Sequence, residues 1–122
     1  MKPYIKEIIK LSPDYPEELV VFEIIGALSN KYSLELFKKI NLIVSKFTYI
    51  VVDMSNIMTI SPSVIDKFVH LAVEIDIRGK KLAFVNFPSE MYIHQIKMHG
   101  VKEELYLFKS IDEALKSLGL IS

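Results

Sequence analysis

The spacing of the hydrophobic positions changes several times along the chain, and each change marks an expected strand or helix. Residues 5–11 and 19–25 are rich in β-branched side chains and flank a segment with two prolines and an aspartate, which predicts two strands joined as a hairpin by a longish loop. Residues 31–46 place apolar side chains at the spacing of one helix face and leave lysines for the solvent. Residues 49–54 are almost continuously apolar, which is typical of a central strand covered on both faces.

A second helix is expected to begin at Pro62 and to end near Gly79, because proline is favoured at the first helical position and glycine in the left-handed turn after a helix. Its apolar stripe is wider than a single buried face needs, so we expect part of this stripe to contact a partner. The stripe consists of Val64, Ile65, Phe68, Val69, Leu71, Ala72 and Ile75.

The C-terminal part of the chain continues the alternation of strands and helices. Residues 81–86 predict a strand, and residues 88–100 predict a third helix that a proline opens and a glycine ends. Residues 105–108 predict a short last strand. The final helix follows Ser110, whose spacing to Glu113 is that of a capping box.

These elements follow one another in the order ββαβαβαβα and predict an α/β fold. Two strands followed by alternating helices and strands predict a mixed β-sheet with helices packed on at least one face, its later strands joined by right-handed crossovers. A chain of 122 residues is the size of one ordinary domain. Since it contains no linker, repeat or low-complexity segment, residues 1–122 are expected to form a single domain.

Charge and composition exclude several classes of partner. Fifteen basic residues balance fifteen acidic ones, and only Arg78 among the basic residues is an arginine, so nucleic acid binding is not expected. The chain has no cysteine, which excludes disulfides and cysteine-based zinc sites. No apolar run approaches the roughly 18 residues of a spanning helix, and no export signal is visible. We therefore expect a cytoplasmic protein without membrane insertion.

The sequence offers no clear pattern for catalysis, a metal or a cofactor. His70, His94 and His99 lie on two predicted helices, and the spacing of the last two does not align them on one helix face. Nucleophile-elbow, P-loop and dinucleotide-binding motifs are absent. Asp53 resembles in its place the phosphorylated aspartate of a response-regulator receiver, but the acidic cluster that this fold needs to hold magnesium is missing. No catalytic residue and no cofactor are expected.

The junction from Asp53 to Val64 is the most informative part of the chain, because a buried strand there leads through a short polar loop into the second helix. Asp53 has two interpretations: it accepts amide hydrogen bonds within the turn, or it recognises a partner. Ser61 is expected to be the N-cap residue of the helix, and Ser63 a partly exposed residue of its first turn. Amides at a helix N-terminus favour negative charge, so such a hydroxyl either carries or meets a phosphate or is a plain polar residue of the turn.

Four short segments resemble a known family, the STAS domain. Residues 52–57 are similar to its strand-and-turn pattern LDLSGV, and residues 25–28 to its LxGELD. Residues 100–101 match a late GL, and residues 112–115 match a C-terminal EEAL. The family also has the order ββαβαβαβα, so the chain resembles STAS domains over almost its whole length, specifically those of bacterial anti-sigma factor antagonists.

This resemblance implies a protein that is not an enzyme and acts in a partner switch. In such a switch the unphosphorylated antagonist binds an anti-sigma factor that is also a serine kinase, and the sigma factor is released. Phosphorylation of the antagonist ends the capture, since the added charge opposes a tightly packed contact through repulsion and desolvation. The acceptor is typically the first serine of an Asp-Ser-Ser-Gly or Asp-Ser-Thr-Gly motif at the start of the second helix.

This chain departs from the family pattern at the acceptor. Ser61 replaces the aspartate of the motif, Pro62 the acceptor serine and Val64 the glycine. The candidate acceptors are then displaced hydroxyls, Ser63 first and Ser61 or Thr59 after it. The acidic positions of the earlier pattern are changed as well. The predicted partner-binding loop consists of Ala27, Ser29, Asp53, Ser55, Asn56, Ser61, Pro62 and Ser63.

Three hypotheses follow. The first is an antagonist that binds an anti-sigma factor and is controlled through one of the displaced hydroxyls. The second is a STAS interaction module that docks another protein, or assembles with further STAS domains as a homo-oligomer, without phosphorylation at this loop. The third is a sensor of a small ligand or nucleotide, or an enzyme whose pattern the sequence does not reveal.

Overall fold

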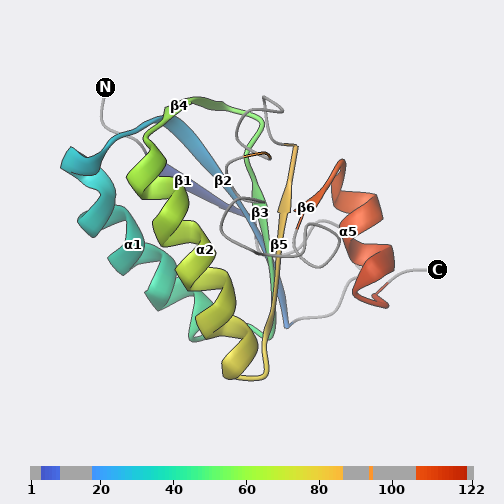
Figure 1. The fold of residues 1–122 in the computed structure, drawn as a ribbon. Coiled ribbons are helices and arrows are strands. Elements are labelled where there is room, and N and C mark those ends of the chain that lie inside the picture. Colours follow the sequence, from blue (N-terminus) through green and yellow to red (C-terminus); the bar gives the residue numbers. More distant parts are fainter. Residues whose placement is uncertain (1–3, 9–17, 87–93, 95–106, 121–122) are drawn as a thin grey trace.

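The computed structural model describes residues 4–8, 18–86, 94 and 107–120 (Figure 1). Its strands are β1 (Tyr4–Ile8), β2 (Leu19–Leu28), β3 (Tyr49–Asp53), β4 (Ile57–Ile60), β5 (Lys81–Val85) and β6 (Leu107–Phe108). The helices with described bounds are α1 (Asn30–Val44), α2 (Pro62–Ile77) and α5 (Ile111–Ser117).

The strands form one mixed sheet in the order β1-β2-β3-β5-β6, with β4 paired to the end of β2. β1 is antiparallel to β2, with Tyr4 opposite Ile25 and Ile8 opposite Val21, so the predicted pairing of the first two strands is confirmed. β2, β3, β5 and β6 run parallel to one another. The predicted α/β class with a mixed sheet is therefore confirmed.

The central strands are buried on both faces, because alternate side chains point into two different layers of helix. Ile50 and Val52 of β3 belong to the larger core beneath α1 and α2, whereas Val51 belongs to a smaller core beneath α5. In the larger core the rings of Phe37 on α1 and Phe68 on α2 lie 5.0 Å apart between their centroids. Figure 1 shows α1 and α2 side by side on one face of the sheet and α5 on the other.

The helix ends agree closely with the sequence signals. α2 begins on Pro62 and is followed by Gly79 in the left-handed region, at φ +80°. Lys80 then donates from Nζ to the carbonyl of Val44 at the end of α1 (2.5 Å). At the start of α5, Oγ of Ser110 accepts from the amide of Glu113 (3.2 Å), which confirms this half of the capping box. None of the helices in the described ranges is long and apolar enough to cross a membrane.

β4 corrects the prediction that a plain polar loop joins Asp53 to α2. This strand pairs in parallel with the last residues of β2, which continues to Leu28 instead of ending at Ile25. Ile57 and Ile60 are buried while the two residues between them are exposed, so the buried positions do not alternate as they do in a half-buried strand. Local periodicity could not reveal β4, because the strand depends on pairing with a distant part of the chain.

The predicted third helix over residues 88–100 lies outside the described residues, apart from His94, which is helical and exposed. Within the predicted strand 105–108, the described residues Leu107 and Phe108 form β6. The pairing of β6 with β5 is parallel, with Leu107 opposite Phe84, so this strand has the place in the sheet that an α/β order requires.

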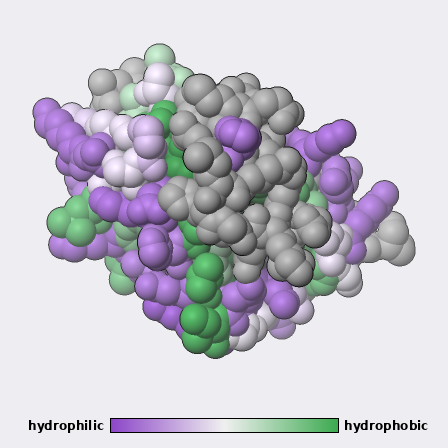
Figure 2. Space-filling view, in the orientation of Figure 1, coloured by the Kyte–Doolittle hydropathy of each residue, from purple (hydrophilic) through white to green (hydrophobic). Residues whose placement is uncertain are grey.

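The wide apolar stripe of α2 is buried within the domain, contrary to the expectation that part of it contacts a partner. Six of its residues are buried and Val69 is half-buried. The apolar side chains that α2 does expose are Val73 (44% exposed) and Ile77 (81% exposed), which lie outside the predicted stripe. Figure 2 shows a narrow hydrophobic strip, in green, that runs along α2 to its lower end among hydrophilic residues.

Candidate functional site

Two segments that are distant in the sequence meet at the N-terminal ends of α1 and α2. The last residues of β2 pair with β4, so that Ala27 lies opposite Thr59. The amide of Ser61 donates to the carbonyl of Leu28 (2.9 Å) and continues this pairing to the start of α2. The predicted partner-binding residues of both segments therefore lie side by side, on the surface where the two helices begin.

Asp53 holds the turn between β3 and β4. Its Oδ1 accepts from the amide of Ser55 (3.0 Å) and from Nδ2 of Asn86 (3.2 Å), so the carboxylate ties the turn to the end of β5. The carbonyl of Asn56 accepts from the amide of Gly26 (3.2 Å), and Gly26 adopts φ +112°, which glycine tolerates. These contacts agree with the interpretation of Asp53 as an organiser of the turn.

α2 begins with Ser61 as its N-cap residue in an extended conformation. The carbonyl of Ser61 accepts from the amides of Val64 (2.9 Å) and Ile65 (3.1 Å). Its side chain makes no capping hydrogen bond, and neither does that of Ser29, the N-cap residue of α1. The position predicted for Ser61 is correct, but its hydroxyl does not satisfy a helix amide as N-cap serines commonly do.

Ser63 is exposed in the first turn of α2, and its hydroxyl has a partner. Its Oγ donates to Oδ1 of Asn30, the first residue of α1. One turn further along α2, Nζ of Lys67 donates to Oγ of the buried Ser33 (2.8 Å), and this hydroxyl donates to the carbonyl of Asn30 (3.1 Å). These four residues form a polar seam between the first turns of the two helices, and the seam places Ser63 within one helical turn of a positive charge.

The surface over β4 and the start of α2 is mostly polar. Its exposed residues are Ser55, Asn56, Met58, Thr59, Pro62 and Ser63, while Ala27, Ser29, Asp53 and Ser61 are half-buried. Ile57 and Ile60 are buried beneath them and fix the strand. Met58 exposes 72% of its surface, and a flexible thioether of this kind adapts readily to a protein partner. The arrangement is suited to contact with another protein.

The histidines are not brought together in the described part of the chain. Nε2 of His70 lies 3.9 Å from Oδ2 of Asp66, one turn away on the same helix. His94 is exposed. His99 lies outside the described residues. No group of three or more His, Cys, Asp or Glu side chains that could hold a metal ion occurs among the described residues. The residues left with a candidate role are those of the polar surface over β4 and the start of α2, which we call the exposed loop, and those of the polar seam.

Sequence reasoning missed Asn30, Ser33, Lys67 and Asn86. Asp53 is the last residue of β3, and Asn86 comes directly after β5. Because neighbouring parallel strands end at the same edge of a sheet, the strand order contained a signal for this pair. Lys67 follows Ser63 by one helical turn, a spacing that places both on one helix face. The bonds from these side chains to α1 depend on how two helices pack, and no local pattern predicts them.

Solved structures share this fold with little sequence identity. The anti-sigma factor antagonist SpoIIAA in its unphosphorylated form matches with a TM-score of 0.71 and 15% identity, over 98% of this chain and 100% of that one. The murine Solute Carrier 26 family member A9 anion transporter matches with a TM-score of 0.65 and 19% identity, over 84% of this chain and 18% of the transporter. An uncharacterized protein with a SpoIIAA-like fold from Shewanella loihica PV-4 has a TM-score of 0.59 and 15% identity, over 98% and 95% of the two chains. At these identities the likeness is one of fold.

Comparison of sequences identifies the family of this chain but no individual curated relative. No curated protein sequence matches the chain significantly. The family profile of the STAS domain, in contrast, matches residues 11–114, a range that includes the exposed loop and the polar seam. The profile and the shared fold confirm the resemblance found in the sequence, and the chain belongs to the STAS domain family.

Proposed function

We propose that this protein is an anti-sigma factor antagonist that binds an anti-sigma factor of the serine-kinase type in a partner switch regulating transcription. The partner rests on the surface formed by residues 27–29 and 55–63. The role is one of binding, so the protein needs neither a catalytic residue nor a cofactor of its own. The proposal implies a cytoplasmic protein, because the sigma factor acts where transcription takes place.

The observation that carries the proposal is the exposed hydroxyl of Ser63 in the first turn of α2, on a chain that shares its fold with the antagonist SpoIIAA. Ser63 follows Pro62, which has the place that the family pattern gives to the acceptor serine. Thr59 is exposed on β4 and Ser61 is half-buried, so these hydroxyls are second and third candidates. All three lie on the same surface.

A phosphate on Ser63 has a clear physical effect in this setting. It replaces the hydroxyl hydrogen, so that Ser63 no longer donates to Asn30. It also adds about −1.5 to −2 charges one turn from Lys67. The first turn of α2 contains no acidic residue, so the positive end of the helix dipole favours this charge in the folded chain. For a docked partner the same charge brings repulsion and a desolvation cost. Phosphorylation thus ends the capture without unfolding the domain.

Two observations favour a second candidate function, a STAS interaction module that is not phosphorylated at this loop. Pro62 has no hydroxyl, and the hydroxyl of Ser63 already has Asn30 as its partner. Such a module uses the same exposed loop to dock a protein or to assemble with other STAS domains.

Phosphorylation in vitro distinguishes the two functions. A pull-down from extract of the native cell first identifies the bound protein, and recovery of an anti-sigma factor is the expected result. Incubation with this kinase and ATP, followed by mass spectrometry, is then expected to place one phosphate on Ser63 and none on a Ser63→Ala variant. Ser61→Ala and Thr59→Ala are tested in parallel, because loss of the phosphate in one of them instead moves the acceptor to that hydroxyl.

Ser110→Ala is the matched control, since Ser110 also precedes a helix and lies outside the proposed surface. This variant should be labelled as the unchanged protein is. If neither the unchanged protein nor any variant is labelled under conditions that label a related antagonist, the hypothesis of a phosphorylation switch is wrong. The second candidate function, an interaction module that is not phosphorylated at this loop, then remains.

A further inference from the structure

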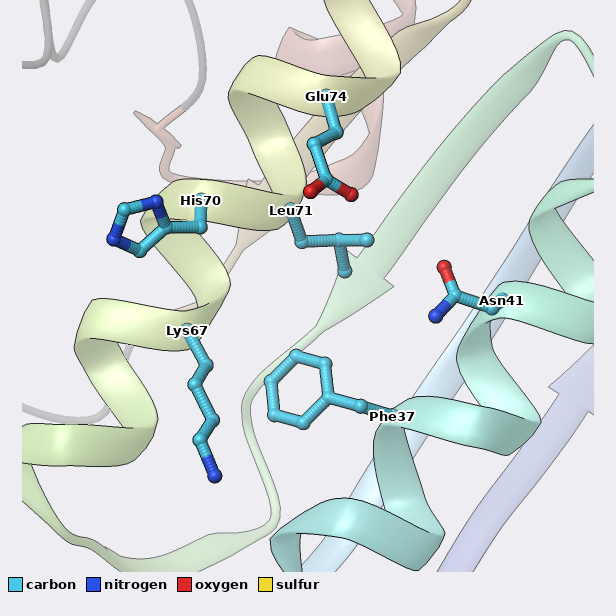
Figure 3. A pocket seen from close by; sticks show the side chains of 6 residues that line it. All are labelled: Phe37, Asn41, Lys67, His70, Leu71 and Glu74. Atoms are coloured by element: carbon cyan, nitrogen blue, oxygen red, sulfur yellow. The ribbon is translucent and has the colours of Figure 1, made fainter.

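α1 and α2 lie parallel on the sheet and leave an open groove between them (Figure 3). The groove has a volume of about 280 Å³, and its lining residues are Phe37, Asn41, Lys67, His70, Leu71 and Glu74. Figure 3 shows the side chains of Phe37 and Leu71 between the two helices, so the floor is apolar while the rim is polar. The groove begins where the polar seam ends, because Lys67 belongs to both.

An exposed leucine extends the apolar floor toward the polar seam. Leu34 is 68% exposed and precedes Phe37 by three residues, a spacing that places both on the same side of α1. Leu42 is also 68% exposed. It lies two turns further along and about 80° around the helix from Leu34, on the side away from α2. Leu34 therefore adjoins the groove, and Leu42 is a matched residue that does not.

The groove is positive at one end and negative at the other. Both helices begin at the end with Lys67, as the bond between Ser63 and Asn30 shows, and neither has an acidic residue in its first turn. The positive ends of two helix dipoles therefore lie beside a lysine. Glu74 lies at the opposite end, about 10 Å further along α2 at 1.5 Å per residue. Figure 3 shows both side chains extending in the same direction along α2, that of Lys67 away from Leu71 and that of Glu74 back toward it.

We propose that this groove docks a short amphipathic helix of the captured partner, with an acidic residue beside Lys67, an apolar residue over Phe37 and Leu71, and a basic residue opposite Glu74. A helix fits this pattern because residues one and two turns apart lie on one face, as Lys67, Leu71 and Glu74 do on α2. Helices commonly dock into apolar grooves through anchors at this spacing. The inference rests on the proposed function only in taking the occupant from the captured partner.

A selection experiment on the complete chain tests the groove without any kinase or partner. A phage-displayed library of short helical peptides, with fixed apolar anchors and variable charged positions, is selected against the unchanged protein and against Glu74→Lys. The unchanged protein is expected to enrich an apolar anchor with an acidic residue one turn to one side and a basic residue one turn to the other. Glu74→Lys should replace the basic position by an acidic one and bind the original peptide about five-fold more weakly, the effect of turning one exposed attraction into repulsion. Glu18→Lys, the same change on an exposed residue before β2, should leave the selection unchanged.

Backbone NMR of the protein titrated with the selected peptide locates the binding surface. Shift changes are expected around residues 34–41 and 67–74, and Leu34→Ser should weaken binding while Leu42→Ser does not. The proposal is overturned if no peptide is enriched, if the shifts are confined to other surfaces, or if the two leucine variants have equal effects. Concentration-dependent dimers whose shifts map to the groove would make a second copy the occupant, which also overturns it. The kinase assay on Ser63 is independent of all these outcomes, so failure of the groove and failure of the phosphorylation switch are distinguishable.

Discussion

A serine precedes both α2 and α5, but its side chain has a different role at each helix start. Each helix follows a serine in an extended conformation. Ser110 caps α5 by accepting from the amide of Glu113, and Asp112 and Glu113 place negative charge in the first turn of that helix. Ser61 makes no such bond with its side chain, and the first turn of α2 contains no acidic residue. The start of α5 thus has a capping bond and acidic residues, whereas the start of α2 has neither and relies on the proline at its first position.

The difference distinguishes a helix start that only stabilises the fold from one that can still accommodate a negative charge. The dipole of α5 is compensated by its own side chains, whereas the dipole of α2 remains available to a negative group from outside or to a phosphate. Natural sequences often give up local stability at functional sites. The contrast therefore supports the proposed partner contact at the start of α2.

The largest expected effect is that of Ser63→Glu, which gives α2 the charge that α5 already has. Capture of the anti-sigma factor should weaken ten-fold or more, about 1.4 kcal/mol, because the charge enters the contact surface. The folded chain should lose no stability, since a charge in the first turn contributes about 0.3–1 kcal/mol through the dipole. Binding calorimetry and thermal unfolding measure the two effects.

Asp112→Asn is the control for this variant, because it removes a charge from the first turn of α5. It should lower the melting temperature slightly and leave capture unchanged. If Ser63→Glu binds the partner as the unchanged protein does, the start of α2 is not part of the contact surface.

A smaller effect is expected from removing the two N-cap hydroxyls. Ser110→Ala should lower the free energy of unfolding by about 1 kcal/mol, because the amide of Glu113 loses its partner. Ser61→Ala should lower it by only about 0.3 kcal/mol or less, since its hydroxyl caps no amide. Urea unfolding of both variants compares them directly. Equal losses would mean that Ser61 caps α2 in solution, and the contrast between the two helix starts would disappear.

The fold was predictable from the sequence where local spacing determines it. The continuous apolar run of β3, the proline that opens α2, the glycine after α2 and the N-cap serine of α5 each have a local physical cause, and each lies where predicted. β4 was missed because its four residues do not alternate between buried and exposed and are held by pairing with β2. Non-local pairing of this kind has no signal within a short window.

The candidate site was predictable only in part for the same reason. The position of Ser61, the exposure of Ser63 and the bond from the Ser55 amide to Asp53 follow from turn and helix-start chemistry within a few residues. The bonds from Ser63 to Asn30 and from Lys67 to Ser33 join residues that are more than thirty positions apart in the sequence. They arise from the parallel packing of α1 on α2, so only the structure could reveal that the hydroxyl of Ser63 has a partner.

The most direct test of the helix start itself is Pro62→Ser, a change with a small effect on stability. The variant restores a serine at the place of the family acceptor and should cost about 0.5 kcal/mol, because proline restricts the unfolded chain more than serine does. Serine is well tolerated at the start of a helix, so the domain should remain folded and should bind its partner. Mass spectrometry after incubation with the captured kinase should then find phosphate on residue 62. If the variant binds the kinase but stays unmodified, Pro62 is not the obstacle, and the acidic residues that this chain lacks at positions 27, 29 and 61 are what a kinase of this type requires at the loop.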